Sequence, residues 1–281
     1  MAPMTGSFDR LGPAAPASPV VVSVPHAGRD YPLALRAALR VPLTSLLPLE
    51  DRHVDRVAID ARRDEIMLVQ RLPRAWIDLN RGEEERDPRV DEGAPVALPP
   101  QQSAKLRSGL GLVPRRASGA GEIWRRRFPA EDIEARIAHD HRPYHAALGE
   151  ILAATHAAFG VAVLVDLHSM PPIEGAQVVI GDRFGRSCGA RFVARIEAEC
   201  GAAGVRSGIN TPYAGGHILD RHGAPDRGIH AVQVELDRAL YLDRRFEAPG
   251  LGLDRSVALV RRILAAVADE ALSYPLAAAA E

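Results

Sequence analysis

Hydrophobic positions along the chain follow two alternating patterns, which predict strands and helices in turn. Short apolar runs rich in valine, isoleucine and leucine are typical of buried strands. Longer segments with apolar residues on one face are typical of helices packed on a core. The predicted strands are 20–24, 66–69, 75–79, 161–167, 177–180, 205–207 and 229–236, and the predicted helices are 31–40, 52–64, 129–159, 189–200 and 253–272. Pro143 is expected to kink or divide the helix at 129–159.

This alternation predicts an α/β fold with a mixed, mostly parallel central sheet flanked by helices. Residues 1–18 are rich in alanine and proline, lack the pattern of a secretory signal, and are predicted to be a flexible leader. With no linker or repeat, residues 19–281 are predicted to form one domain. Residues 82–128 have poor periodicity and both an acidic and a basic run, so we expect a long insertion there, a functional lid or a mobile segment.

Composition narrows the class of protein. The chain has 281 residues, 47% of them hydrophobic and 25% charged, which is ordinary for a soluble globular protein. A formal net charge of −1 gives no reason to expect a nucleic acid or an anionic membrane as a partner. No apolar run reaches the ~20 residues of a membrane helix. Only Cys188 and Cys200 are present, so we expect a reduced, cytoplasmic protein without a disulfide scaffold. The oligomeric state stays open.

Two windows place a histidine after an apolar strand. His26 follows 20–24 in a turn stiffened by Pro25 and shaped by Gly28, and His168 ends the strand 161–167. The carboxyl ends of parallel strands are where open α/β sheets bind ligands, so the two imidazoles are predicted to meet there. With a carboxylate they would make a catalytic zinc shell of three protein ligands. The alternative for each is an ordinary surface, capping or core histidine.

The carboxylate is sought in LEDRHVD, residues 49–55. Asp51 is the first candidate, although a residue just before a helix is also a natural N-cap. Glu50, His53 and Asp55 are rival ligands in the same window.

Two further windows suggest a substrate site and a base. Asn80 and Arg81 end the predicted strand of WIDLNRG, where an arginine fork suits a substrate carboxylate. Glu235 stands in the apolar run VQVEL, where a carboxylate is costly unless it is paired or serves as an acid or base. Its alternative is an outward-facing position on an edge strand.

Together these windows resemble the N-formylglutamate amidohydrolase family. The motifs that carry the resemblance occur in order from about residue 20 to 241: SVPHAG, LEDRHVD, IDLNR, RPYH, VDLHS, GGHILDRHG and VQVEL. That family is in turn similar to the zinc carboxypeptidase and aspartoacylase fold, so the resemblance implies a zinc carboxypeptidase-like metallohydrolase.

The resemblance also implies residue roles. His26 and His168 would be metal ligands, Asn80 and Arg81 would bind the substrate carboxylate, and Glu235 would be the general base. In the wider fold a glutamate stands three residues after the first histidine, but here that position is Arg29. The missing ligand is therefore assigned to Asp51, with Asp166 expected to orient His168.

The implied reaction is hydrolysis of a small anionic N-acyl amino acid, N-formyl-L-glutamate, to formate and glutamate with one Zn²⁺ as cofactor. Arg221 would pair with the second carboxylate of glutamate, and His217 would hold the developing oxyanion.

Three alternatives remain. GRSCG, residues 185–189, matches the nucleophile elbow of serine hydrolases around Ser187, but no strand leads directly into it. A metal-binding or ligand-binding protein without catalysis would not need Glu235. Within the same reaction class, another acyl group or amino acid would serve equally well, because a binding arginine reports only an anionic end. The basic run 115–128 either attracts such anions or is a solvated insertion.

Overall fold

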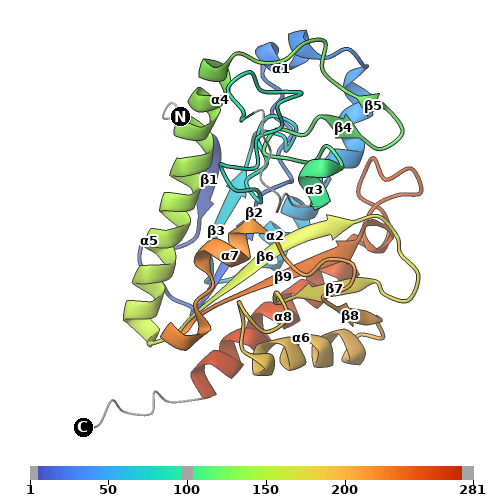
Figure 1. Ribbon diagram of the computed structural model, residues 1–281. Coiled ribbons are helices and arrows are strands. Elements are labelled where there is room, and N and C mark those ends of the chain that lie inside the picture. The colour runs from blue at the N-terminus through green and yellow to red at the C-terminus, as the bar shows by residue number, and fades with distance from the viewer. Residues whose placement is uncertain (1–5, 96–103, 274–281) are drawn as a thin grey trace. The chain divides into compact units, whose positions relative to one another are not determined.

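The computed structural model describes residues 6–95 and 104–273, and it has the predicted α/β fold (Figure 1). A mixed, mostly parallel sheet with the strand order β1-β3-β2-β6-β9-β7-β8 is flanked by helices. Its strands are β1 (Phe8–Leu11), β2 (Val20–Val24), β3 (Ile66–Gln70), β6 (Ala162–Met170), β7 (Val178–Gly181), β8 (Ser207–Ile209) and β9 (Ile229–Asp237). Within it, β7 runs antiparallel to β9. A separate small hairpin consists of β4 (Arg116–Ala117) and β5 (Gly121–Glu122).

The helices agree in part with the predicted ranges. They are α1 (Leu33–Ala38), α2 (Val54–Ala61), α3 (Ala104–Arg107), α4 (Ala130–Arg136), α5 (Arg142–Phe159), α6 (Ala190–Ala202), α7 (His217–His222) and α8 (Leu253–Ser273). The pattern did not predict α7, because its six residues are too few to show a helical period.

The chain divides into two compact units and passes between them several times. Unit 1 comprises Met1–Asp9, Pro25–Asp51 and Gln70–Ala146, and unit 2 comprises Arg10–Val24, Arg52–Val69 and Ala147–Glu281. Neither unit is a continuous stretch of sequence. One domain from residue 19 onward stays a prediction.

Unit 2 is built on the central strands β2, β6 and β9, which pair in parallel. Both faces of these strands are covered, so their residues are buried almost without exception. The helices α2, α6 and α8 pack on one another and against the sheet, and α7 contacts β9 (Figure 1). Polar side chains buried in β6 and β9 are therefore exceptions that require partners.

The sheet begins before the predicted domain boundary. Phe8–Leu11, inside the stretch predicted as a leader, forms the edge strand β1. The ring of Phe8 packs edge-on against Tyr144 with ring centroids 5.3 Å apart, and the backbone N–H of Arg71 donates to the Ser7 carbonyl. So short a strand leaves little alternation in the sequence, which is why the pattern did not indicate it.

Two strand predictions were wrong in ways that affect the site. Residues 75–79 form turns and irregular backbone rather than a strand, and their backbone groups bond to loop carbonyls and to buried side chains instead of a neighbouring strand. The strand predicted to end at Leu167 continues to Met170, so His168 lies inside β6. The β6 extension pairs in register with β9 up to Asp237.

Pro143 does not divide the helical segment at 130–159, but the helical geometry changes just before it. The segment Ile137–His141 between α4 and α5 is a π-helix, and it continues directly into α5 at Arg142. A proline removes a backbone donor and crowds the carbonyl of the preceding turn, and a wider π turn is a known way to accommodate such a defect.

The insertion at 82–128 is a packed part of unit 1 in the part that the structure describes. Leu112, Val113, Ile123 and Trp124 are buried in it. The basic run begins with a structural residue, since Arg115 is buried and donates from Nε to Asp87 at 2.9 Å. Residues 96–103, in the middle of the predicted lid, lie outside the described residues.

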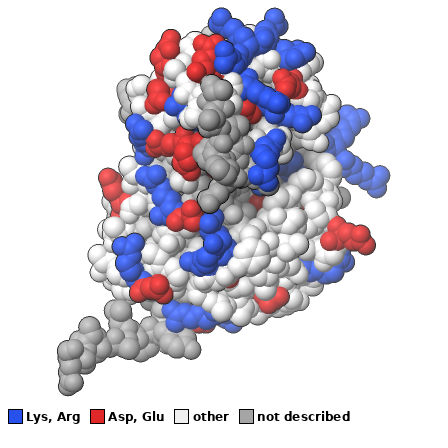
Figure 2. Space-filling view, in the orientation of Figure 1, with Lys and Arg blue, Asp and Glu red and all other residues white. Residues whose placement is uncertain are grey.

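Surface features add little to the functional picture. Acidic and basic side chains both occur over the face shown in Figure 2, in keeping with the formal net charge of −1. Among the helices that the structure describes, none combines the length and the apolar character needed to cross a bilayer.

The buried Arg115–Asp87 pair yields a test of the packed insertion. Asp87→Asn should lower the free energy of unfolding by about 1–3 kcal/mol, because the buried guanidinium of Arg115 loses a charged partner and keeps only the half-exposed Glu122. The matched control is Glu92→Gln, whose partner Arg127 lies 3.9 Å away at a half-exposed site and whose loss should cost below about 1 kcal/mol. Equal effects in urea unfolding would contradict the structural role of Asp87.

Candidate functional site

His26 is a buried side chain of unit 1, two residues beyond β2. Its Nε2 lies 2.7 Å from Oδ1 of Asp78, and its Nδ1 lies 3.6 Å from Oδ2 of Asp51. The backbone N–H of Asp51 also donates to the His26 carbonyl at 3.0 Å. A Cβ on Gly28 would lie 2.1 Å from the carbonyl oxygen of Leu72, so only glycine allows this turn to pass so close. The predicted stiff turn is therefore present.

Asp78 is the residue that orients His26, and the sequence analysis missed it. It is fully buried and accepts hydrogen bonds from Nε of Arg74 and the backbone N–H of Asn80, both at 2.8 Å. Burial opposes its ionisation, but the charges of Arg74, His26 and Arg81 and the hydrogen bond from His26 hold the pKa of its carboxyl well below the usual range. Since a carboxylate only accepts, Nε2 of His26 carries its hydrogen.

Asn80 and Arg81 are buried in the turn after Asp78, not at a strand end as predicted. Nε of Arg81 donates to the Leu110 carbonyl at 2.9 Å, and Nη1 donates to the carbonyl of Asn80. The guanidinium is thus held by the backbone of unit 1. Its planar fork has a defined orientation.

Unit 2 contains a second buried histidine with the same kind of support. Nε2 of His168 lies 2.7 Å from Oδ2 of Asp166, and the Ser23 hydroxyl donates to Oδ1 of Asp166 at 2.7 Å. Asp166 and His168 share one face of β6 because side chains two apart in a strand point the same way. The expected contact between Asp166 and His168 is present.

Glu235 lies beside His168 in the sheet. The two are opposite each other in the parallel β6–β9 register. Its side chain is buried and accepts from Nε2 of Gln233 at 2.9 Å. Since β9 stands between β6 and β7, the alternative of an outward-facing edge residue is wrong.

The helix α7 carries the other predicted residues of unit 2. His217 is its first residue and is partly buried, whereas Arg221 is exposed. Burial, together with the charges of Arg221 and His217, lowers the pKa of His222 to about 4, against the opposing charge of Asp166. His222 is therefore a neutral imidazole at neutral pH.

Two of the three rivals of Asp51, Glu50 and His53, have other partners. The Tyr31 hydroxyl donates to Glu50, and Nε2 of His53 lies 3.2 Å from the Glu247 carbonyl. Asp55 is in the first turn of α2. The N-cap position of α2 is His53, so the capping alternative for Asp51 is wrong.

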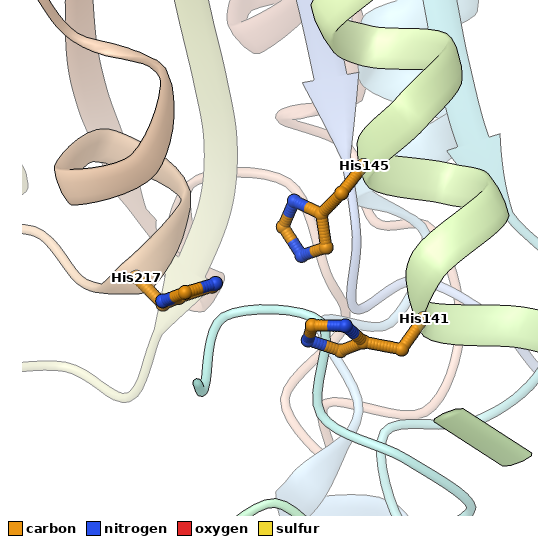
Figure 3. Close-up of side chains that lie close together, drawn as sticks. All are labelled: His141, His145 and His217. Atoms are coloured by element: carbon orange, nitrogen blue, oxygen red, sulfur yellow. The ribbon is translucent and has the colours of Figure 1, made fainter. Parts of the chain in front are cut away.

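A pair of histidines in RPYH and the preceding segment was not assigned a role from sequence. His141 and His145 are fully buried on neighbouring helical turns, with ring centroids 4.4 Å apart (Figure 3). Nε2 of His141 lies 2.8 Å from the Arg81 carbonyl, and Nε2 of His145 lies 2.9 Å from the Leu79 carbonyl. Their i, i+4 spacing was the signal available in the sequence.

The donor chemistry suits a divalent metal. In unit 1, the ligand atoms of His26 and Asp51 lie within 4.8 Å of one another, as do those of His141 and His145. In unit 2, His168 has its own carboxylate partner, Asp166. Imidazole and carboxylate are the ligands of catalytic zinc sites, so the residue types fit such an ion.

The serine-hydrolase alternative has no geometric support. Ser187 is buried, and its hydroxyl donates to the Ala231 carbonyl at 2.8 Å. The nearby His230 has its Nδ1 bonded by the backbone N–H of Gly189. Ser187 is thus a structural residue that ties the start of α6 to β9.

Comparisons with known proteins agree with the resemblance seen in the motifs. The model of the N-formylglutamate amidohydrolase family matches residues 18–242. N-formylglutamate deformylase of Pseudomonas aeruginosa is 30% identical over 238 residues, which cover 81% of this chain and 83% of that protein. The deformylase of Pseudomonas putida is 32% identical over 235 residues, covering 80% and 82%. The crystal structure of N-formylglutamate amidohydrolase from Ralstonia eutropha superposes with a TM-score of 0.85 at 28% identity, covering 94% of this chain and 98% of that one.

The low pKa of His222 predicts a pH-dependent loss of stability. In the unfolded chain this imidazole takes up a proton near pH 6.5, but in the folded protein only near pH 4. Its contribution to the free energy of unfolding is therefore complete above about pH 6.5 and is lost as the pH falls toward 4. His222→Gln should flatten the stability curve in this window. Parallel curves for the two proteins in urea unfolding would contradict the assignment.

Proposed function

Because the chain belongs to the N-formylglutamate amidohydrolase family, we propose that it hydrolyses N-formyl-L-glutamate to formate and glutamate with a bound divalent metal, Zn²⁺. One observation carries the metal part of the proposal. Two buried histidines, His26 and His168, each have Nε2 bonded at 2.7 Å to a fully buried carboxylate. Histidine ligands of metals very often have such a carboxylate partner, which fixes the ring and its tautomer.

His26, Asp51 and His168 are the proposed ligands. The hydrogen on each Nε2 leaves Nδ1 as the ligand atom of both imidazoles, and Asp51 lies on the Nδ1 side of His26. Asp51 replaces the glutamate that the wider fold places at the position of Arg29. When bound, the metal would polarise the formyl carbonyl and lower the pKa of water from ~15.7 toward ~7.

Glu235 is the proposed general base. It is buried beside His168 on a central strand, and the amide of Gln233 orients its carboxylate. Glu235 would take a proton from the attacking water and then deliver it to the nitrogen of the departing glutamate. The same carboxylate can serve both steps because the amine needs a proton as the C–N bond breaks.

Asn80 and Arg81 are proposed to bind the carboxylate of the amino acid. The backbone bonds of Arg81 hold the guanidinium in place before substrate arrives, which reduces the entropy lost on binding. The exposed Arg221 is proposed for the second carboxylate, and His217, at the start of the same helix, for the oxyanion. The acyl group and amino acid are the parts of the proposal that an assay against a panel of N-acyl amino acids must decide.

Metal removal tests the proposed cofactor. Dialysis against a chelator should abolish hydrolysis of N-formyl-L-glutamate, and one equivalent of Zn²⁺ should restore it. His26→Ala and His168→Ala should lose bound metal by elemental analysis, while His139→Ala at an exposed helical position should keep it. For the third ligand, Asp51→Asn should lose metal and Glu50→Gln should not. Full activity in the metal-free protein would overturn the proposal.

Glu235→Gln separates a base from a structural carboxylate. It removes the proton acceptor but keeps the shape, so metal content should be normal while turnover falls by roughly 10²–10⁴-fold. The matched control is Glu65→Gln, a buried glutamate that accepts from the Arg63 backbone and is proposed to have no role in the reaction. Turnover per folded enzyme should stay unchanged in that control. Normal turnover with a lower melting temperature in Glu235→Gln would make it a structural residue.

A further inference from the structure

The turn that contains Asn80 and Arg81 has unusual backbone bonding. The carbonyl of Leu79 accepts from His145, that of Asn80 from the Arg81 side chain, and that of Arg81 from His141. Three consecutive carbonyls are thus bonded by buried side chains rather than by a neighbouring strand. The Trp76 carbonyl accepts in the same way from Nη1 of Arg136, at 3.0 Å.

All the donors outside the turn come from one helical segment, which consists of α4, the π-helix Ile137–His141 and α5. Arg136 and His141 are five residues apart, and His141 and His145 are four apart. In a regular α-helix, residues five apart point to different sides. The wider π turn at Ile137–His141, with i→i+5 bonding, brings Arg136 and His141 close to one face, and both donate to the turn together with His145.

We propose that His141 and His145 are positioning residues that set the geometry of the carboxylate-binding turn at Asn80 and Arg81. The proposal rests on the proposed function, because it concerns the substrate site named there. Both imidazoles act through the backbone of the turn, and neither is required to touch substrate. The π turn is the feature of the fold that aligns them.

The physical basis is the cost of a buried carbonyl without a donor. Irregular backbone lacks the regular hydrogen bonds of a helix or sheet. A buried carbonyl that loses its donor therefore either stays unsatisfied, at a cost in desolvation free energy, or moves toward another donor. A turn that moves by a fraction of an ångström no longer presents the Arg81 fork to a carboxylate in the correct orientation. The expected defect is therefore in substrate binding rather than in chemistry.

Paired substitutions test this at each histidine. His141→Phe and His145→Phe keep an aromatic ring but remove the donor, whereas His141→Gln and His145→Gln keep a side-chain N–H. Each Phe variant should raise KM for N-formyl-L-glutamate about tenfold with kcat changed less than about threefold, as expected for a lost hydrogen bond to a buried group. In the Gln variants, KM should stay much closer to the wild-type value than in the Phe variants. The control is His139→Phe, at an exposed position of the same helical segment.

Hydrogen exchange provides a readout that does not depend on activity. The amides of residues 78–82 should exchange faster in the Phe variants than in the Gln variants or the control. If the wild-type protein does not hydrolyse N-formyl-L-glutamate but this exchange pattern holds, the proposed function fails and the positioning role stands. Unchanged KM and unchanged exchange in both Phe variants would overturn the positioning role. Loss of one equivalent of bound metal in the Gln variants would also overturn the positioning role, because His141 and His145 would then be metal ligands.

Discussion

A buried carboxylate must be compensated, and in this protein two of them are compensated by histidines. Asp78 and Asp166 are fully buried, and each is 2.7 Å from Nε2 of an imidazole. Removing a carboxylate from water costs several kcal/mol unless charges or hydrogen bonds replace the lost hydration. Each aspartate therefore constrains its histidine to one ring orientation and one tautomer, and the proposed metal site depends on both constraints.

The two units meet this requirement differently. In unit 2 the sheet itself supplies the geometry, since Ser23, Asp166 and His168 occupy neighbouring strand positions with side chains on one face. In unit 1 the chain is irregular around Asp78, and the compensation comes from Arg74, from a backbone N–H and from His26. Strand geometry needs few additional contacts, whereas an irregular turn needs a separate partner for each polar group.

The irregular backbone of unit 1 also explains why a helical segment bonds the turn at residues 79–81. The turn at residues 79–81 has carbonyls that no strand reaches, and the helical segment with the π turn at Ile137–His141 provides two of their donors. A regular helix would not place Arg136 and His141 on a common face. The local departure from α-helical geometry and the irregularity of the turn are thus complementary, and each would carry an energetic cost without the other.

The sequence by itself determined the α/β class, because apolar runs such as Val20–Val24 are visible without neighbours. The proposed ligands and base came from the resemblance of its motifs to a known family, with His168 and Glu235 standing out as polar residues in or after apolar runs. The order of the motifs indicated the family. Only the tertiary structure decided that residues 75–79 are not a strand and that His168 lies inside β6. It also placed Asp78 against His26, and His141 and His145 against the carbonyls of Arg81 and Leu79. The physical reason is the separation along the sequence of the residues that interact. Periodicity reports burial within a few residues, whereas a hydrogen bond between Arg81 and His141 joins positions 60 apart and depends on how the whole chain packs.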